Sequence, residues 1–267
     1  MKSRPLLGLL QERYIDYTKD ELYAFVLCGN VVVNGERNRD PRGIVPTDAS
    51  IELSGGGRFV SRGGDKLARA IELWKIPVEG RCFLDAGAST GGFTDCLLQN
   101  GATVVHSVDV GYNQLDFRIR NDSRVRVHER TNIMAVTAED LEPPPDAAVA
   151  DLSFRSLSGA ASQLLRLTRE GWAVALAKPQ FETHGEIPGF AGVLADEGLI
   201  MGVLDSLWSN LEREGVRVKA ITESPIRGRK GNREFLLWLE SGAEPAQPAS
   251  IRHGKIEQAL AESRGIA

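Results

Sequence analysis

Asp85-Ala-Gly-Ala-Ser-Thr-Gly-Gly-Phe-Thr94 is the stretch of this sequence that decides the expected fold. It joins a short apolar run to a helix-like segment, as a turn between a strand and a helix does. Gly87, Gly91 and Gly92 allow the backbone to turn tightly and to approach a ligand closely. In open parallel sheets, ligands bind beyond the carboxyl ends of the strands. The stretch therefore predicts a cofactor-binding loop, although glycine-rich turns also occur in α/β proteins without that role.

The spacing of the glycines indicates which kind of cofactor this loop would hold. It lacks the G-x-G-x-x-G pattern, which disfavours a dinucleotide whose pyrophosphate rests on a helix N-terminus. An acid at the end of the strand, Asp85, instead suits a cofactor that carries an amino-acid ammonium group. Asp109 ends the next strand-like run, where a carboxylate can accept hydrogen bonds from ribose hydroxyls.

Strand-like and helix-like segments alternate from residue 59 onward. The strand-like runs are residues 82–85, 104–110, 125–128, 147–151, 173–178, 216–223 and 234–239, and the helix-like stretches are residues 66–74, 93–100, 157–167 and 199–214. This alternation predicts a mostly parallel sheet with helices on both faces. The connection between the last two runs is too short for a helical crossover, so these strands should form an antiparallel hairpin. We expect an α/β fold with a class I (Rossmann-like) methyltransferase sheet whose last strand is a reversed edge strand.

The beginning of the chain predicts a small α+β unit. Two helix-like segments precede the run Val31-Val-Val33, the Asn34-Gly35 turn and a strand that could pair back at residues 51–53. The glycines after Ser54 are typical of a linker. We therefore divide the chain into residues 1–54, a linker of residues 55–60, the large domain of residues 61–242 and a tail of residues 243–267 with one short helix.

Four charged residues far apart in the chain interrupt or flank apolar segments. Lys66 opens a helix-like stretch, Asp151 and Lys178 close strand-like runs, and Glu234 begins the last one. Each alone is more often a surface charge. Together they fall at the catalytic edge expected of the sheet. A lysine at the end of a buried strand is partly desolvated, which favours a neutral amine able to act as a base, and Asp151 would orient it.

Composition narrows the class of protein further. The 267 residues carry a net charge of −4, which argues mildly against a nucleic-acid binder, because counterion release rewards a basic surface. The three cysteines and four histidines show no ligand spacing, so we expect no metal site. No apolar run approaches the roughly 20 residues that span a bilayer, and no signal peptide is evident. We expect a cytoplasmic protein that does not bind membranes.

Six motifs together resemble one known family. They are Phe59-Val-Ser-Arg-Gly-Gly-Asp-Lys66-Leu, the glycine loop, Val108-Asp-Val-Gly-Tyr112, Ala150-Asp-Leu-Ser-Phe154, Lys178-Pro-Gln-Phe-Glu182 and Gly231-Asn-Arg-Glu-Phe-Leu236. Over nearly the whole chain the sequence resembles the TlyA family, ribosomal RNA 2'-O-ribose methyltransferases with an N-terminal S4 RNA-binding domain and an FtsJ-like catalytic domain, often labelled hemolysins.

The resemblance implies an activity and assigns residues to it. It implies methyl transfer from S-adenosylmethionine to a ribose 2'-hydroxyl, of a cytidine by analogy, in ribosomal RNA within ribosomal subunits, by a monomer or weak dimer. The implied catalytic tetrad is Lys66, Asp151, Lys178 and Glu234, in which Lys178 activates the hydroxyl. The implied cofactor site comprises Asp85, Gly87, Ala88, Ser89, Thr90, Gly91, Gly92, Asp109, Val110 and Asn132.

The N-terminal unit departs from the S4 pattern. The segment Tyr17-Thr-Lys-Asp-Glu21 stands where such domains usually carry a Ser-Arg pair, and the acids of residues 1–55 nearly balance the bases. We therefore expect the S4 fold more than tight RNA binding by this unit alone. The candidate RNA contacts are Lys19, Arg37, Arg62, Arg120, Arg227 and Lys230, with Arg39 and Arg42 as further candidates in the N-terminal unit.

Three other functions compete with this interpretation. A membrane-lytic protein, as the hemolysin label suggests, would require a spanning segment or a strongly amphipathic basic helix. A non-catalytic RNA-binding assembly factor would be expected to have lost at least one of the four charged residues. A nicotinamide-dependent oxidoreductase is disfavoured by the pattern of the glycine loop.

Overall fold

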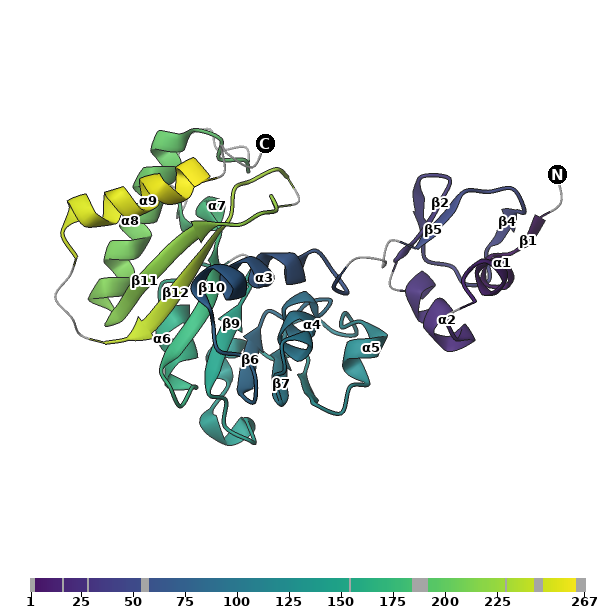
Figure 1. Cartoon of the computed structure of the whole chain (residues 1–267), viewed down its shortest axis with the longest axis horizontal. Coiled ribbons are helices and arrows are strands. Elements are labelled where there is room, and N and C mark those ends of the chain that lie inside the picture. The colour runs from purple at the N-terminus through teal and green to yellow at the C-terminus, as the bar shows by residue number, and fades with distance from the viewer. Residues whose placement is uncertain are drawn as a thin grey trace.

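The computed structural model of the chain describes residues 3–15, 17–27, 29–53, 58–153, 155–183, 192–228, 230–242 and 247–262. Residues 55–57 of the expected linker, and residues 243–246 and 263–267 of the expected tail, lie outside this set. The described chain forms a small N-terminal unit and a larger α/β domain (Figure 1). Phe59 and Val60, at the end of the expected linker, are buried in a core cluster of the larger domain.

Two helices and five short strands lie within the described residues of the N-terminal unit. These are β1 (Ser3–Pro5), α1 (Leu6–Arg13), α2 (Lys19–Leu27), β2 (Val31–Val33), β3 (Glu36–Asn38), β4 (Ile44–Pro46) and β5 (Ile51–Leu53). Strand β2 pairs antiparallel with β5, as the sequence predicted, and also with β3, for which we made no prediction. The turn between β2 and β3 uses positive φ at Asn34 (51°) and Gly35 (86°), the backbone that two-residue hairpin turns require.

A small apolar core of its own stabilises this unit. Among the residues whose burial is described, Leu6, Leu10, Leu22, Val26 and Val31 are fully buried in it. The N-terminal unit meets the larger domain where α2 approaches the short helix α5 (Phe117–Arg120).

The larger domain is built on one seven-stranded sheet. Its strands are β6 (Cys82–Ala86), β7 (Val104–Val108), β8 (Val125–His128), β9 (Ala147–Ala150), β10 (Trp172–Ala177), β11 (Val216–Glu223) and β12 (Phe235–Ser241), in the spatial order β11-β12-β10-β9-β6-β7-β8. Strands β8, β7, β6, β9 and β10 run parallel, and β12 runs antiparallel to both β10 and β11. The antiparallel hairpin predicted for the last two strands is confirmed.

The expected position of the reversed strand was wrong. We expected β12 at the edge of the sheet, but it is inserted between β10 and β11, which leaves β11 as the edge. Strand β12 pairs over its whole length with apolar β10, from Trp172↔Glu240 to Ala177↔Phe235. Because its side chains are apolar on both faces, burial on both sides favours this central position.

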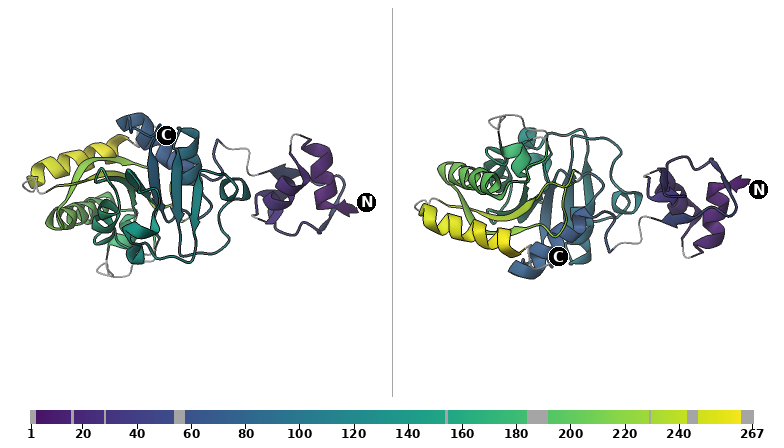
Figure 2. Two further views of the ribbon diagram at one scale, coloured as in Figure 1. Left: turned by 90° about the horizontal axis from the view of Figure 1, so that it is seen from below. Right: turned by 90° about the horizontal axis from the view of Figure 1, so that it is seen from above.

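Helices cover both faces of the sheet (Figure 2). They are α3 (Gly63–Trp74), α4 (Gly92–Gln99), α5, α6 (Ala160–Arg166), α7 (Pro179–Glu182), α8 (Glu197–Arg213) and α9 (Ala249–Glu262), with two short 3-10 turns at Ile133–Ala135 and Ala138–Asp140. Helices α3 and α4 pack on one face, and α6 and α8 pack on the other. No helix in the described ranges is long and apolar enough to cross a membrane.

Helix α9 is longer than the short tail helix we predicted. It lies beside the edge strand β11 and α8, and its residues Ile256, Ala259 and Leu260 join the core formed with α8. Exposed strand edges invite pairing with other chains, and a covering helix prevents it. Helix α9 therefore both completes the core and protects the edge of the sheet.

Candidate active site

Four elements bring the four predicted charged side chains to the carboxyl-terminal edge of the parallel strands. Lys66 lies in the first turn of α3, Asp151 follows β9, Lys178 follows β10 and Glu234 immediately precedes β12. Because β12 is antiparallel to β10, its beginning lies at the edge where β10 ends, which the pairing of Ala177 with Phe235 confirms. The predicted convergence of the four residues is therefore found in the structure.

The four side chains form a continuous series of alternating charges. Lys66 Nζ lies 2.7 Å from Glu234 Oε2 and 3.5 Å from Asp151 Oδ2. Lys178 Nζ lies 2.6 Å from Asp151 Oδ1. The exposed fractions of the side chains are 12% for Lys66, 22% for Asp151, 9% for Lys178 and 5% for Glu234. Such buried charges persist only when they are paired, and these two lysines and two carboxylates have no net charge together.

Lys178 is held in a defined direction. Its ammonium donates hydrogen bonds to the carbonyl oxygen of Leu152 at 3.0 Å and to Ser153 Oγ at 3.3 Å, in addition to its ion pair with Asp151. Both acceptors lie in the loop after β9, so this loop and the end of β10 are fixed to each other. The nitrogen of Lys178 is thereby held at this edge by three oxygen atoms.

The glycine loop after β6 has the backbone that a close approach requires. Gly87 has φ of 81°, and a Cβ atom on it would lie 2.6 Å from the carbonyl oxygen of Asp151. Gly91 has φ of 92° at the N-terminus of α4. Any side chain on Gly87 would therefore displace the backbone that carries Asp151. The loop and the charged residues are in direct contact.

Asp109 and the segment after β7 close the other side of the loop. The Asp109 carboxylate accepts hydrogen bonds from the backbone N–H of Ser89 at 2.8 Å and of Gly111 at 2.6 Å. Each carboxylate oxygen can accept a further bond, so a ribose can still be bound there. Next to it, Val110 is 71% exposed, which leaves an apolar side chain open beside Asp109.

Asn132 is exposed and begins a 3-10 turn, where its side-chain oxygen accepts a hydrogen bond from Met134 N. The segments carrying Asp109 and Asn132 are joined, because the N–H of Thr131 donates to the carbonyl oxygen of Asp109. The predicted cofactor residues of β6, β7 and the segment after β8 thus belong to one continuous group of loops.

Asp85 is fully buried at the base of the glycine loop. Burial raises the pKa of its carboxyl from 3.8 to about 7, against a hydrogen bond from Thr94 that lowers it. Thr94 Oγ1 donates to Asp85 Oδ2 at 2.6 Å and lies 2.8 Å from Ser107 Oγ. The other oxygen, Oδ1, is buried without a hydrogen-bond partner in the described part of the chain. Asp85 can therefore accept a further hydrogen bond, and a cationic ligand bound beside it would favour the ionised form of its carboxyl group.

The predicted RNA contacts fall into two groups. Lys19, Arg37, Arg62, Arg227 and Lys230 are exposed, as are Arg39 and Arg42. Arg62 immediately precedes α3 and lies one helical turn before Lys66. Arg120 is only half exposed, and its guanidinium is paired with Glu129. The structure thus leaves most of these cations open to a ligand, whereas Arg120 already has a protein partner.

Several residues of this edge carried no role in the sequence prediction. Glu182 is buried, accepts a hydrogen bond from Leu157 N at 3.0 Å and contacts Ser156 Oγ. It thereby holds the loop that bears Ser153. Thr94, which hydrogen-bonds to Asp85, and Ser107, whose hydroxyl lies against that of Thr94, also had no predicted role. These residues occur within or beside the quoted motifs, but only the fold shows which distant segment each one contacts.

The sheet order, the glycine loop and the charged residues at the carboxyl edge together define a class I methyltransferase. Residues 59–241 match the family FtsJ-like methyltransferase. The chain belongs to this family, and among its members to the TlyA group, so it is an enzyme whose methyl donor is S-adenosylmethionine.

Two relatives and one solved structure indicate how far the similarity extends. The chain is 38% identical to YqxC of Bacillus subtilis (strain 168), over 98% of this chain and 94% of that protein. It is 40% identical over 205 residues to the 16S/23S rRNA (cytidine-2'-O)-methyltransferase TlyA of Mycobacterium tuberculosis (strain ATCC 25618 / H37Rv), 76% of each chain. A Streptococcus thermophilus structure that carries the name hemolysin has a TM-score of 0.73 and 35% identity, and covers 99% of this chain and 98% of its own. The membrane-lytic alternative is not favoured, because the matching family is one of methyltransferases.

Proposed function

We propose that this protein transfers a methyl group from S-adenosylmethionine to the 2'-hydroxyl of a cytidine in ribosomal RNA, with Lys178 as the group that activates the hydroxyl. The observation that carries the proposal is the close approach of Lys66, Asp151, Lys178 and Glu234 beside the glycine loop. The relative named as a 16S/23S rRNA (cytidine-2'-O)-methyltransferase supports the substrate. A ribosomal substrate implies that the reaction takes place in the cytoplasm.

The residues of the glycine loop fit the methyl donor. The backbone at Gly87 and Gly91 leaves no room for side chains, so a ligand can approach the main chain itself. Asp85 offers an unpartnered buried oxygen for a cationic group, and Asp109 lies where a ribose would be bound. When bound, S-adenosylmethionine would supply an electrophilic methyl group on a positively charged sulfur, which would keep the electrons of the broken carbon–sulfur bond and leave as a neutral thioether.

Lys178 would accept the proton of the ribose 2'-hydroxyl as the oxygen forms its bond to the methyl carbon. Asp151 would orient the amine, and Lys66 with Glu234 would hold Asp151 and the nucleotide in place. Most of the rate gain in such a transfer comes from holding the reacting atoms in near-attack geometry, with general base catalysis adding about 10²- to 10⁴-fold.

The N-terminal unit would act as an S4-like RNA-binding domain. Its exposed Lys19, Arg37, Arg39 and Arg42 are available for phosphate groups, and Arg62, Arg227 and Lys230 offer further cations near the active site. Phosphate contacts of this kind position a nucleic acid without reading its sequence. The choice of nucleotide would then depend on contacts at the active-site edge.

The experiment that tests this proposal compares the 2'-O-methylation of ribosomal RNA with and without the protein, by mapping of modified nucleotides. Purified wild-type protein with S-adenosylmethionine and unmodified ribosomal subunits should add a 2'-O-methyl group to a cytidine. Lys178→Ala should lower the turnover by about a thousandfold, because the base is lost, while the calorimetric affinity for S-adenosylmethionine changes little.

Asp85→Ala is the complementary variant, since it should weaken binding of S-adenosylmethionine and leave the tetrad intact. Equal turnover by the wild type and Lys178→Ala would refute the role of Lys178. If wild-type protein modified no ribosomal RNA under conditions where it binds the methyl donor, the proposed substrate would be wrong.

A further inference from the structure

Helix α9 lies beyond the residues that match the methyltransferase family, which end at residue 241. Its C-terminal end nevertheless reaches both elements that carry the Lys66–Glu234 pair. One contact joins it to Arg233, the residue before Glu234, and another joins it to α3, the helix that carries Lys66. These contacts give α9 a connection to the active site that its position at the edge of the sheet does not suggest.

The first contact is made by Arg233, the neighbour of Glu234 in the chain. Arg233 is buried, and its Nη2 donates a hydrogen bond of 3.0 Å to the carbonyl oxygen of Leu260 in α9. Its Nε also donates to Glu223 Oε1 at 2.9 Å, and its Nη1 donates to Glu197 Oε1 at 2.8 Å. One guanidinium therefore joins α9, β11 and the beginning of α8 at a single point, directly beside Glu234.

The second contact is made by the last described residue of α9. Glu262 accepts a hydrogen bond from Thr222 Oγ1 at 3.1 Å and lies 3.9 Å from Arg69 Nη2. Arg69 and Lys66 are three residues apart on α3, so they lie on neighbouring turns of one face. An ion pair this exposed contributes little stability by itself. Its place in the fold, however, joins the helix of Lys66 to the same end of α9.

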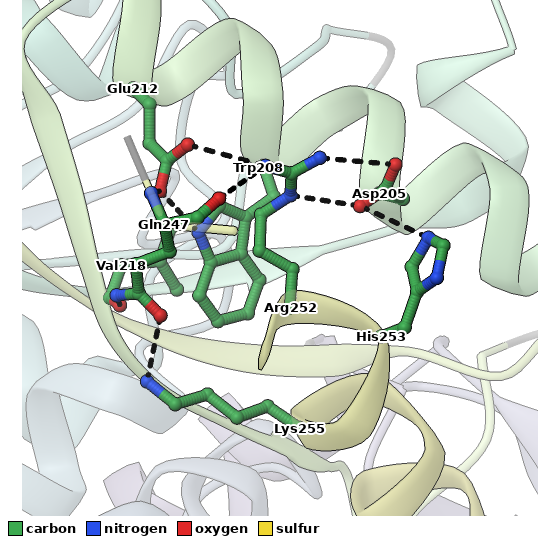
Figure 3. Close-up of polar contacts among 8 residues, drawn as sticks. All are labelled: Asp205, Trp208, Glu212, Val218, Gln247, Arg252, His253 and Lys255. Atoms are coloured by element: carbon green, nitrogen blue, oxygen red, sulfur yellow. Dashed lines mark hydrogen bonds and ion pairs between the residues drawn. The ribbon is translucent and has the colours of Figure 1, made fainter. Parts of the chain in front are cut away.

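The N-terminal half of α9 is anchored elsewhere, to α8 (Figure 3). Arg252 Nε donates to Asp205 Oδ1 at 2.9 Å, and Arg252 Nη1 donates to the carbonyl oxygen of Gln247 at 2.7 Å. Glu212 of α8 lies 3.7 Å from the same guanidinium. This anchor resembles that of Arg233 in chemistry, although the Arg252 side chain is 13% exposed and that of Arg233 is 6% exposed. It contacts none of the four residues of the proposed tetrad in the described structure.

We infer that Arg233 is a positioning residue for the methyl transfer. Through its contact with α9, Arg233 holds Glu234 in the geometry of the active site, and through Glu234 it also holds Lys66. The inference rests on the proposed function for its effect on turnover. Arg233 and Arg252 both stabilise the packing of α9, since each fixes this helix to the domain. A positioning role belongs to Arg233 alone, because only Arg233 adjoins a residue of the tetrad.

The experiment compares Arg233→Gln with the matched control Arg252→Gln in the full-length protein. Both substitutions remove one guanidinium that holds α9, so both should lower the thermal unfolding temperature. Below that temperature, with saturating methyl donor and ribosomal subunits, we expect kcat to fall by about tenfold or more in Arg233→Gln only, because small displacements of catalytic groups are costly. KM should change little in either variant. Arg233→Lys, which keeps the charge, should recover part of the loss.

A second measurement does not depend on methyl transfer. The ε-amine of Lys66 is shielded by its ion pair with Glu234, so its rate of chemical acetylation, followed by peptide mass spectrometry, reports on the pair. We expect faster labelling of Lys66 in Arg233→Gln and the wild-type rate in Arg252→Gln. Unchanged labelling of Lys66 in Arg233→Gln, or equal losses of kcat in both variants, would overturn the inference. If labelling behaves as expected but no protein methylates ribosomal RNA, the positioning role stands and the proposed substrate fails.

Discussion

The carboxyl-terminal edge of the sheet contains two regions that are built in different ways. The region after β6 and β7 is formed largely by main chain: glycines with positive φ and backbone N–H groups that bond to Asp109. The region after β9 and β10 is formed by side chains, with two lysines and two carboxylates in alternation. In the function we propose, the first region would bind the cofactor, and the second would supply charges to the reaction.

Because the two regions are built differently, substitutions should disrupt them in different ways. A backbone-built site fails when a side chain takes the space or the conformation that it needs. A charge-built site fails when one partner is removed and the other remains buried without compensation. The two regions meet at Gly87, which lies against the carbonyl oxygen of Asp151. Substitutions on either side should therefore have separable effects, except at this point of contact.

The largest effect in this comparison is expected from Lys66→Met. It leaves Glu234 buried without its counter-charge, which should cost about 3 kcal/mol of unfolding free energy and lower kcat by about a hundredfold through misplacement of the tetrad. The affinity for S-adenosylmethionine, measured by calorimetry, should remain near that of the wild type. A large loss of cofactor affinity would contradict the separation of the two regions.

The double variant Lys66→Met/Glu234→Gln distinguishes charge compensation from catalysis. Removal of both charges takes away the buried unpaired carboxylate, so denaturant unfolding should show that most of the lost stability returns. The turnover should stay low, because the pair that positions Asp151 is still absent. Recovery of turnover together with stability would show that Lys66 has only a structural role.

Gly87→Ala is expected to affect both regions, with Gly80→Ala as its matched control. Both glycines have positive φ, of 81° and 76°, but a Cβ on Gly80 would meet no atom within 4 Å. Each substitution should cost about 1–2 kcal/mol of stability for the left-handed backbone. Only the Cβ of Gly87→Ala would also press on the carbonyl oxygen of Asp151 and so displace the loop. Binding of S-adenosylmethionine should therefore weaken by about tenfold or more in this variant alone, a tenfold loss being about 1.4 kcal/mol. Equal affinities in the two variants would place the cofactor away from this loop.

The smallest effect concerns the pH dependence of cofactor binding. The pKa of Asp85 is about 7 in the folded protein, raised by burial from 3.8. Because the folded state keeps a proton that the unfolded state releases, this group makes the protein less stable as the pH rises from about 4 to 7. A cationic ligand favours the ionised carboxylate, so affinity for S-adenosylmethionine should rise with pH up to about 7 and then level off.

Thr94→Val tests the origin of this pH dependence. It removes the hydrogen bond that lowers the pKa of Asp85, so the rise in affinity should move to higher pH, with binding about threefold weaker at pH 6.5. Ser107→Ala is the control, since in the described structure the hydroxyl of Ser107 hydrogen-bonds to Thr94 and not to the Asp85 carboxylate. Calorimetry in two buffers of different ionisation enthalpy gives both the affinity and the protons released. Identical pH profiles for the wild type and Thr94→Val would exclude Asp85 as the titrating group.

Much of the fold could be predicted because periodic patterns reflect local physics. Apolar runs bounded by glycine or charge predicted each strand of the large sheet to within a few residues, and the short connection after β11 predicted the final hairpin. The position of β12 inside the sheet could not be predicted in this way. Strand order depends on which apolar faces pack together, and β12 is apolar enough to be buried on both sides.

The sequence by itself determined the residue types of the site: a glycine loop after an acid, and two lysines and two carboxylates placed at the ends of apolar runs. Those positions follow from chain-local rules, since charges and glycines mark where buried strands stop. Only the tertiary structure decided the partners, because 168 residues separate Lys66 from Glu234 and 85 separate it from Asp151. It also brought α9 against Arg233, a contact that no spacing in the sequence reveals. Distances between segments are determined by packing of the whole domain, and packing is a property of all the apolar faces together.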